Sequence, residues 1–265
     1  MKLGFIGTGN MGGAIVRGCV AAGMAAGEIS AFDKDAGKSA ALAAGQGIRT
    51  AGSIADLAAA SDVVILAVKP GNFEEVLPEL AGALRADHKV VSMAAGVSIA
   101  YIERFLGASR KIIRIMPNTP AMVGESMTAV SRNANVGEEE FSSVMQIFRA
   151  IGRAEAVEES LMDTVTGLSG SSPAYVYMFI DALTQGAVRN GMDEAKARTF
   201  AAQSVLGAAK MVLETGTDPR TLRENVCSPG GTTIEAVEVL RRVGFEDKVT
   251  EAMQAAVDKS KKLTK

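Results

Sequence analysis

The stretch KLGFIGTGNMGGAIVRG, residues 2–18, decides the fold of the first half of the chain. It opens on a short apolar run, which is typical of a buried strand. Gly7, Gly9 and Gly12 follow in the spacing G-x-G-x-x-G, and an apolar helical pattern begins directly after them. A strand, a glycine-rich turn and a helix in this order predict the first unit of a dinucleotide-binding, Rossmann-type domain.

Each glycine of this turn has its own expected task. Gly7 is expected to allow the tight turn, Gly9 to let a pyrophosphate approach the backbone, and Gly12 to let the helix pack closely on the strand. The anion would then meet the amides at the helix N-terminus. The residues of the turn that we predict to bind the cofactor are Ile6, Gly7, Thr8, Gly9, Asn10 and Met11.

Asp33 and Lys34 extend the predicted cofactor site. Asp33 ends the second apolar stretch, EISAFD at residues 28–33, where an acidic side chain bonds the ribose hydroxyls and favours NAD. Lys34 and Lys38 are close enough in sequence to neutralise the 2′-phosphate of NADP. At this point both NAD and NADP remain open as cofactors.

The ends of two later strands complete the predicted cofactor site. Ala67, Val68, Lys69 and Pro70 follow the fourth apolar stretch, and ligands of such sheets lie beyond the carboxyl ends of the strands. Lys69 either touches the cofactor or is merely exposed in the loop. Ala95 lies among small residues after the fifth stretch, which suit a flat ring lying against backbone.

Strand and helix patterns alternate from residue 2 to about 155, and only helical patterns follow residue 158. We therefore predict an α/β protein, with an N-terminal Rossmann-type doubly wound sheet at residues 1–157 and an all-α C-terminal domain at 158–265. The strand within 121–131 is expected to lie antiparallel at a sheet edge. The late helices are apolar around much of their circumference, which favours dimerisation over a compact monomeric core.

The composition excludes several classes of protein. The 265 residues carry a formal net charge of -2 without a basic run, so we expect no nucleic-acid partner. Apolar runs are too short to span a bilayer and the chain opens directly on a strand, so we expect a cytoplasmic protein without membrane association.

Few side chains offer metal or acid–base chemistry. Cys19 and Cys227 lie far apart and outside any ligand spacing, so we expect packing residues and neither a disulfide nor a metal site. His88, the single histidine, stands in the polar stretch LRADHKVV and is expected to be a solvated turn residue without a catalytic role.

Seven stretches together resemble the pyrroline-5-carboxylate reductase family, and they cover nearly the whole chain. They are GFIGTGNMGGAI, LAVKP, AAGVSI, MPNTPAMVGES, DTVTGLSGSSPAYVYMFIDAL, VLGAAKMVLETG and SPGGTTIEAV, of which the last three are highly specific. The resemblance implies reduction of 1-pyrroline-5-carboxylate to L-proline by NADPH or NADH, the last step of proline biosynthesis, with hydride passing from the nicotinamide to the protonated cyclic imine. It also implies a homo-oligomer of intertwined dimers, often assembled into decamers.

Under this resemblance, the stretch CSPGGTT at 227–233 becomes the substrate site of the helical domain. Successive N–H groups at a helix start form a cradle for the substrate carboxylate, and glycines let the anion come close. The predicted substrate contacts are Ser228, Gly230, Gly231, Thr232 and Thr233. Thr233 is also the predicted catalytic residue, touching the ring nitrogen or the carboxylate. The resemblance further implies that Asn225 reaches the cofactor of the neighbouring subunit. Without it, the same turn reads equally well as an ordinary helix start.

Two alternatives have distinguishable signatures. β-Hydroxyacid dehydrogenases of similar architecture need a lysine acid on the first helix of the second domain, but this chain has no lysine between Lys111 and Lys196. A protonated imine needs little acid catalysis, so orientation becomes the main task, and the stretches at 116–120 and 167–175 are expected near the nicotinamide and the interdomain cleft. The second alternative is a non-catalytic dinucleotide-binding regulator, which would bind the cofactor without imine-dependent oxidation.

Overall fold

The computed structural model describes residues 1–264, which form two compact units. The sheet unit contains residues 1–171 and the chain from Ala255 onward, and the helical unit contains residues 172–254. The units divide after Ser171 because the segment after the last strand stays on the sheet unit, where Met162 is fully buried against Met116 and Ala129. The compact units therefore divide later than the predicted domain boundary after residue 157. That boundary, which separates a cofactor-binding domain from a dimerisation domain, stays a prediction.

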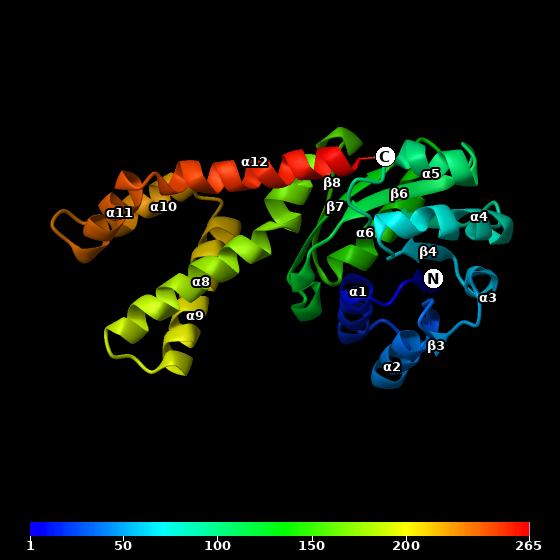
Figure 1. The fold of residues 1–265 in the computed structure, drawn as a ribbon, viewed down its shortest axis with the longest axis horizontal. Coiled ribbons are helices and arrows are strands. Elements are labelled where there is room, and N and C mark those ends of the chain that lie inside the picture. The colour runs from blue at the N-terminus through cyan, green and yellow to red at the C-terminus, as the bar shows by residue number, and fades with distance from the viewer. Residues whose placement is uncertain (265) are drawn as a thin grey trace. The chain divides into compact units, whose positions relative to one another are not determined.

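The sheet has eight strands in the order β3-β2-β1-β4-β5-β6-β7-β8, all of them within residues 3–156, where strand and helix patterns alternate (Figure 1). The strands from β3 to β6 pair in parallel, and β7 is antiparallel to β6, as predicted. The predicted edge position of β7 is wrong, because β8 pairs with it in parallel and takes the edge. The strands are β1 Leu3–Ile6, β2 Ile29–Phe32, β3 Arg49–Thr50, β4 Val63–Leu66, β5 Lys89–Ser92, β6 Lys111–Met116, β7 Ser126–Arg132 and β8 Gly152–Ala156.

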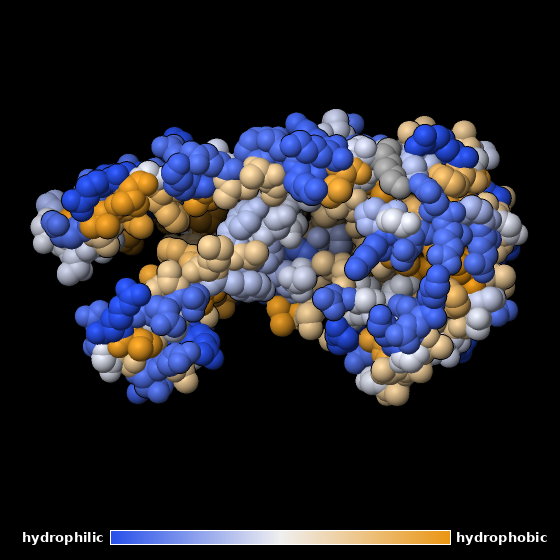
Figure 2. All heavy atoms as spheres, in the orientation of Figure 1, coloured by the Kyte–Doolittle hydropathy of each residue, from blue (hydrophilic) through white to orange (hydrophobic). Residues whose placement is uncertain are grey.

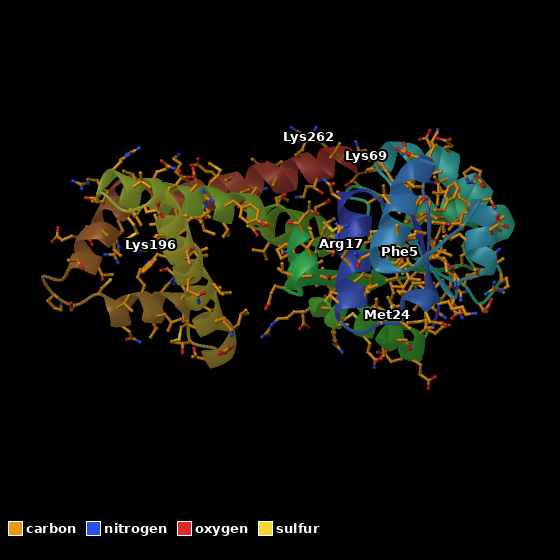
Figure 3. The ribbon with its side chains drawn as sticks, turned by 90° about the horizontal axis from the view of Figure 1, so that it is seen from below. Phe5, Arg17, Met24, Lys69, Lys196 and Lys262 are labelled. Atoms are coloured by element: carbon orange, nitrogen blue, oxygen red, sulfur yellow. The ribbon has the colours of Figure 1, made fainter. Side chains whose placement is uncertain are left out.

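Helices cover both faces of this sheet, so successive strand residues are buried on opposite sides. Phe5 of β1, labelled in Figure 3, belongs to the core with α1, α2 and α6, whereas its neighbour Ile6 belongs to the core with α3, α4 and α5. These helices are α1 Asn10–Ala21, α2 Ala36–Gln46, α3 Ile54–Ala59, α4 Phe73–Ala83, α5 Ile99–Leu106 and α6 Glu138–Arg149. The doubly wound fold class is confirmed.

The helical unit exposes many large apolar side chains. Its only buried residues among those described are Thr184, Ala197 and Ala201, while Tyr177, Met178 and Phe200 are at least 59% exposed. Apolar patches are visible on its surface in Figure 2. Its helices are α8 Ser172–Arg189, α9 Glu194–Thr215, α10 Pro219–Val226, α11 Thr232–Arg242 and the first part of α12 Phe245–Leu263. Such surfaces require a partner, as expected for a dimerisation unit. No helix within residues 1–264 is long and apolar enough to cross a membrane.

The expectation of a solvated His88 is wrong, since this side chain is only 2% exposed. Its Nδ1 accepts the Arg85 amide at 2.8 Å, and its Nε2 lies 3.0 Å from the Ala58 carbonyl and 2.9 Å from that of Ser61. These backbone partners satisfy the ring inside the protein and leave the proton on Nε2. His88 therefore ties the end of α3 to the start of β5 and lines neither of the cavities described below.

Cys19 is fully buried in the core under α1, which confirms it as a packing residue, and Cys227 is a half-buried free thiol. Burial raises the pKa of the Cys19 thiol to about 12, so almost no thiolate forms at pH 8. In a Cys227→Ser protein we expect maleimide to leave Cys19 unmodified until denaturant is added, measured by intact-mass spectrometry. Labelling of Cys19 in the native protein within minutes would contradict this expectation, because it would show that the core around Cys19 opens readily without denaturant.

Candidate active site

The glycine turn between β1 and α1 leaves an open cradle at a helix start. Gly7 has φ 101°, and a Cβ there would lie 2.6 Å from the Ala67 carbonyl oxygen, so only glycine fits. A Cβ on Gly12 would lie 2.4 Å from the Gly7 carbonyl oxygen. A Cβ on Gly9 would meet nothing within 4 Å. Because the first amides of α1 have no partner inside the helix, this open space fits a pyrophosphate.

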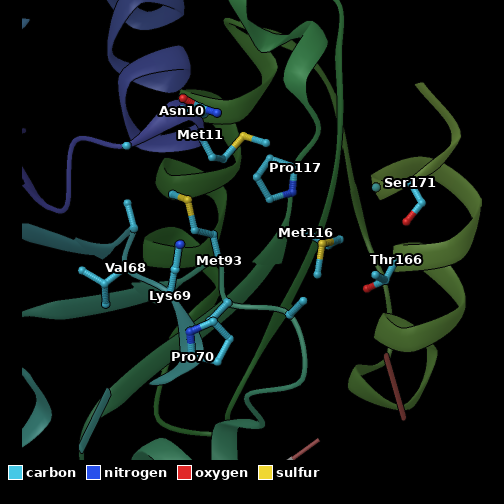
Figure 4. A pocket seen from close by; sticks show the side chains of 15 residues that line it. Asn10, Met11, Val68, Lys69, Pro70, Met93, Met116, Pro117, Thr166 and Ser171 are labelled. Carbon is cyan, nitrogen blue, oxygen red and sulfur yellow. The ribbon is translucent and has the colours of Figure 1, made fainter. Parts of the chain in front are cut away.

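A cavity of 620 Å³ begins at this cradle and continues along the ends of β4, β5 and β6 (Figure 4). Eight predicted cofactor residues line it, namely Gly9, Asn10, Met11, Ala67, Val68, Lys69, Pro70 and Ala95. Met116 and Pro117 of the 116–120 stretch and Gly170 and Ser171 of the 167–175 stretch also line it, on the sheet unit. Figure 4 shows Thr166 and Ser171 on the side opposite Val68 and Lys69.

A second cavity of 450 Å³ shares Gly9 and the segment from Ala67 to Lys69 with the first. Its other predicted residues are Ile6, Gly7, Asp33 and Lys34. Two adjacent cavities that share lining residues at the glycine cradle fit the two halves of a dinucleotide, with the pyrophosphate between them. Thr8 lines neither cavity and instead holds Asp33.

Asp33 is fixed as a charged group at the end of β2. Its Oδ2 accepts the Thr8 amide at 2.7 Å and the Thr8 hydroxyl at 2.9 Å, while its Oδ1 accepts the Asp35 amide at 3.0 Å. Partial burial raises the pKa of Asp33, but these hydrogen bonds and the nearby Lys38 outweigh it and hold that pKa below its usual value. The carboxylate therefore stays ionised in the neutral range.

Acidic side chains of α4 also reach the second cavity. Glu75 and Glu79 line it, and Glu75 pairs with Lys34 at 2.9 Å. Both partners of this pair are mostly exposed, so it is easily broken by a ligand. The cavity is thus lined by three carboxylates, Asp33, Glu75 and Glu79, and by three lysines, Lys34, Lys38 and Lys69.

The first cavity is nearly free of titratable groups. Lys69 is the only such side chain among the residues that line it, and it is exposed in the loop while bordering both cavities. Met11, Met93 and Met116 supply most of the remaining large side chains. Such a lining can hold a flat ring and exclude water, but it offers no acid–base pair.

Met93 and Thr166 are cavity residues that the sequence did not predict. Met93 comes directly before the predicted small residues at the end of β5, so its place in the chain is a usable signal. Thr166 gives no such signal, because its position depends on a π-helical turn, Thr166–Gly170.

The predicted substrate residues gather at the start of α11. Gly231 is the N-cap residue, Gly230 has φ 69°, and the Gly231 amide donates to the Ser228 carbonyl at 3.0 Å. Thr232 and Thr233 are exposed, and their side chains make no hydrogen bond within residues 1–264. These residues and Asn225, which is exposed near the end of α10, belong to the helical unit, whereas residues of the sheet unit line both cavities.

Comparison with known proteins identifies both parts of the chain. Residues 159–263 match the family model described as pyrroline-5-carboxylate reductase dimerisation, and residues 2–96 match that of NADP oxidoreductase, coenzyme F420-dependent. The pyrroline-5-carboxylate reductase of Escherichia coli K12 is 51% identical over 265 residues, covering 100% of this chain and 98% of that protein.

Solved structures agree with this match. A pyrroline-5-carboxylate reductase of Coxiella burnetii superposes with a TM-score of 0.91 at 35% identity. The pyrroline carboxylate reductase of Plasmodium falciparum, solved with NADP bound, superposes with a TM-score of 0.90 at 30% identity. Each comparison covers 100% of this chain and 98% of the other.

The sheet, the glycine cradle and the paired cavities define an NAD(P)-dependent oxidoreductase. Its second half is a dimerisation domain, so the chain forms a homo-oligomer. With half of its residues identical over the full length of a reductase, the chain belongs to the pyrroline-5-carboxylate reductase family. It reduces 1-pyrroline-5-carboxylate to L-proline with NADPH or NADH, the last step of proline biosynthesis.

Proposed function

We propose that the two cavities hold the dinucleotide with its nicotinamide end in the larger one. The open space at Gly9 supports a pyrophosphate contact with the amides of Asn10 and Met11, and Asp33 and Lys34 border the adenosine ribose. Met93, Ala95 and Met116 provide the apolar wall that suits a flat ring. When bound, the reduced nicotinamide supplies the hydride.

We propose that the start of α11 binds the substrate carboxylate through the amides of Gly230, Thr232 and Thr233, with the Ser228 and Thr233 hydroxyls adding hydrogen bonds. The Gly231 amide already donates to the Ser228 carbonyl at 3.0 Å, so Gly231 contributes by letting the anion come close. The free N-terminal amides and the positive end of the helix dipole support this role. In the oligomer, Asn225 contacts the cofactor of the neighbouring subunit. Thr233 orients the ring nitrogen for reduction.

The observation that carries this mechanism is the cavity lining, in which Lys69 is the only titratable side chain. An imine already protonated in solution needs no acid from the protein, so the lining residues act by orienting the reactants and excluding water. A ketone reductase would need a proton donor beside the carbonyl oxygen, which becomes an alkoxide when the carbon accepts the hydride.

The function is tested by following NADPH and NADH absorbance with 1-pyrroline-5-carboxylate, with a hydroxyacid and its ketone as comparison substrates. Imine-dependent oxidation and formation of L-proline are expected. Tight cofactor binding without imine-dependent oxidation would instead identify a dinucleotide-binding regulator, and turnover of the ketone alone would identify a hydroxyacid dehydrogenase.

Asp33→Ser is expected to raise the ratio of kcat/KM for NADPH to that for NADH about tenfold. A carboxylate near the ribose repels a 2′-phosphate, and a unit charge at about 4 Å is worth roughly 1 to 4 kcal/mol between bulk water and a protein surface. Because the pKa of Asp33 is held below its usual value and a phosphate monoester loses its second proton near pH ~6, the preference of the wild type should stay constant between about pH 7 and pH 9.

Asp35→Ser is the matched control for this change. It removes the same charge two residues away and keeps an oxygen that can cap α2, where Asp35 accepts the Gly37 amide at 3.1 Å. Asp35 does not line the second cavity, so the ratio of kcat/KM for NADPH to that for NADH in Asp35→Ser should stay within twofold of the wild-type ratio. Equal shifts in both variants would attribute the effect to overall charge and remove Asp33 from the ribose contact.

We also propose that dimers assemble further into decamers and that the protein works in the cytoplasm. The exposed apolar faces of the helical unit support extensive association, and two free cysteines suit a reducing compartment. Light scattering measures the assembly as a multiple of the 27.5 kDa chain. A mass that stays at the dimer over a wide range of protein concentrations would exclude the decamer.

A further inference from the structure

The side chain of Asn118 joins three segments around the larger cavity. It is 7% exposed, and it follows Met116 and Pro117 at the end of β6. Its Oδ1 accepts the Met127 amide at 3.0 Å and the Ser126 hydroxyl at 3.2 Å, both on β7. Its Nδ2 donates to the Ser169 carbonyl at 3.0 Å, in the π-helical turn Thr166–Gly170. One buried amide thus connects a loop, a strand and a helical turn.

The Ser169 carbonyl needs this donor because of the residue four positions later. In an α-helix that carbonyl would accept the amide of residue 173, which is a proline and has no N–H. The turn is wide, since the Ser171 amide donates to the Thr166 carbonyl at 2.8 Å, five residues back. Wide turns of this kind occur often at functional sites. Asn118 therefore replaces a hydrogen bond that Pro173 removes.

Two of the segments that Asn118 connects carry neighbouring walls of the larger cavity. Met116 and Pro117 line one wall, and Thr166, Gly170 and Ser171 line the next (Figure 4). The walls approach closely at one point, because a Cβ on Gly170 would lie 3.5 Å from Met116 Sδ. Asn118 itself does not line the cavity, so it acts on the site only through these neighbours.

We propose that Asn118 is a positioning residue that sets the distance between these walls, and with it the alignment of the nicotinamide and the imine. The inference rests on the proposed placement of the nicotinamide in the larger cavity. Cofactor affinity should depend little on Asn118, because the cradle at Gly9 and the second cavity contain none of the residues that it bonds. Its loss should therefore lower kcat and leave cofactor binding intact.

Asn118→Asp tests the donor while keeping the side-chain shape. The introduced carboxyl still accepts from Met127 and Ser126, but when ionised it faces the Ser169 carbonyl without a proton to donate. We expect kcat to fall about tenfold, since small misplacements of reactants are costly. The Kd for NADPH, from its fluorescence, should stay within twofold of wild type.

Two further readouts separate positioning from simple loss of stability. Amides of residues 166–171 should exchange hydrogen faster in ligand-free Asn118→Asp than in wild type. The kcat of the variant relative to wild type should fall further as pH rises, because a protonated carboxyl can donate to Ser169 and an ionised one cannot.

Asn133→Asp is the matched control. Asn133 also bridges segments, donating to Glu103 Oε1 at 2.9 Å and to the Arg110 carbonyl at 2.8 Å, and accepting the Ile112 amide at 3.2 Å, but it lies at the opposite end of β6. The Asn133→Asp protein should have a lower melting temperature than wild type and the same kcat.

Wild-type kcat in Asn118→Asp, or a loss no larger than in Asn133→Asp, would overturn the inference. Failure of the wild type to oxidise NADPH with the imine would refute the proposed function instead. The exchange measurement on ligand-free protein would still decide whether Asn118 holds the turn.

Discussion

Gly12→Ala is expected to weaken NADPH binding at least about 100-fold. The added methyl carbon would lie 2.4 Å from the Gly7 carbonyl oxygen and 3.0 Å from the Ala67 side chain, and the first contact is backbone that cannot move aside. Helix α1 must therefore shift away from β1 and β4, which displaces the amides of its first turn from the cradle at Gly9. Overpacking of this kind also costs about 1 to 3 kcal/mol of stability.

The neighbouring residue in the same helix provides the control for this prediction. The three atoms nearest to a Cβ on Gly13 would all belong to the guanidinium end of Arg17, the closest at 3.3 Å, and this flexible side chain can move. Gly13→Ala should therefore bind NADPH like wild type and gain about 0.5 to 1 kcal/mol from the lower backbone entropy of the unfolded chain.

Isothermal titration with NADPH measures the affinities, and chemical denaturation shows whether Gly12→Ala remains folded under the same conditions. Equal affinities of Gly12→Ala and Gly13→Ala for NADPH would contradict the close packing of α1 as the reason for glycine at position 12. A folded Gly12→Ala protein that fails to bind is the expected result.

Local sequence patterns predict the sheet unit well because its determinants are local. The central strands β1, β4, β5 and β6 are short, mostly apolar runs, and the positive φ of Gly7 and the crowding at Gly12 follow from a motif of six residues. The carboxyl ends of parallel strands meet at one edge, so the order of strands along the chain is enough to predict that Ala67, Lys69 and Ala95 lie together.

The unpredicted features depend on contacts between residues distant in sequence. Asn118 and Ser169 are 51 residues apart, and nothing in either stretch indicates that an amide replaces the hydrogen bond that a proline removes. The polar neighbours of His88 favour a solvated ring, yet carbonyls 27 and 30 residues away bury and satisfy it. The place of β8 at the sheet edge likewise depends on pairing with β7, which local patterns do not specify.

Substrate binding at the start of α11 leads to the second large expected effect. Thr233→Ala should lower kcat/KM for 1-pyrroline-5-carboxylate about 10- to 100-fold, since a hydrogen bond to a charged group contributes roughly 1.5 to 3 kcal/mol. The Thr233 hydroxyl is exposed and makes no hydrogen bond within residues 1–264, so it is free to bind a ligand and its removal leaves no buried group unsatisfied.

Thr233→Ser should restore most of the activity, because it keeps the hydroxyl at the first turn of α11. Thr221→Ala removes an equally exposed threonine from α10 and should leave the kinetics unchanged. Steady-state kinetics with each variant, together with the Kd for NADPH, separates loss of substrate contact from loss of cofactor. If Thr233→Ala retains wild-type kcat/KM, the hydroxyl does not touch the substrate, and the backbone amides at the start of α11 must hold the carboxylate without it. A parallel fall in NADPH affinity would place Thr233 at the cofactor instead.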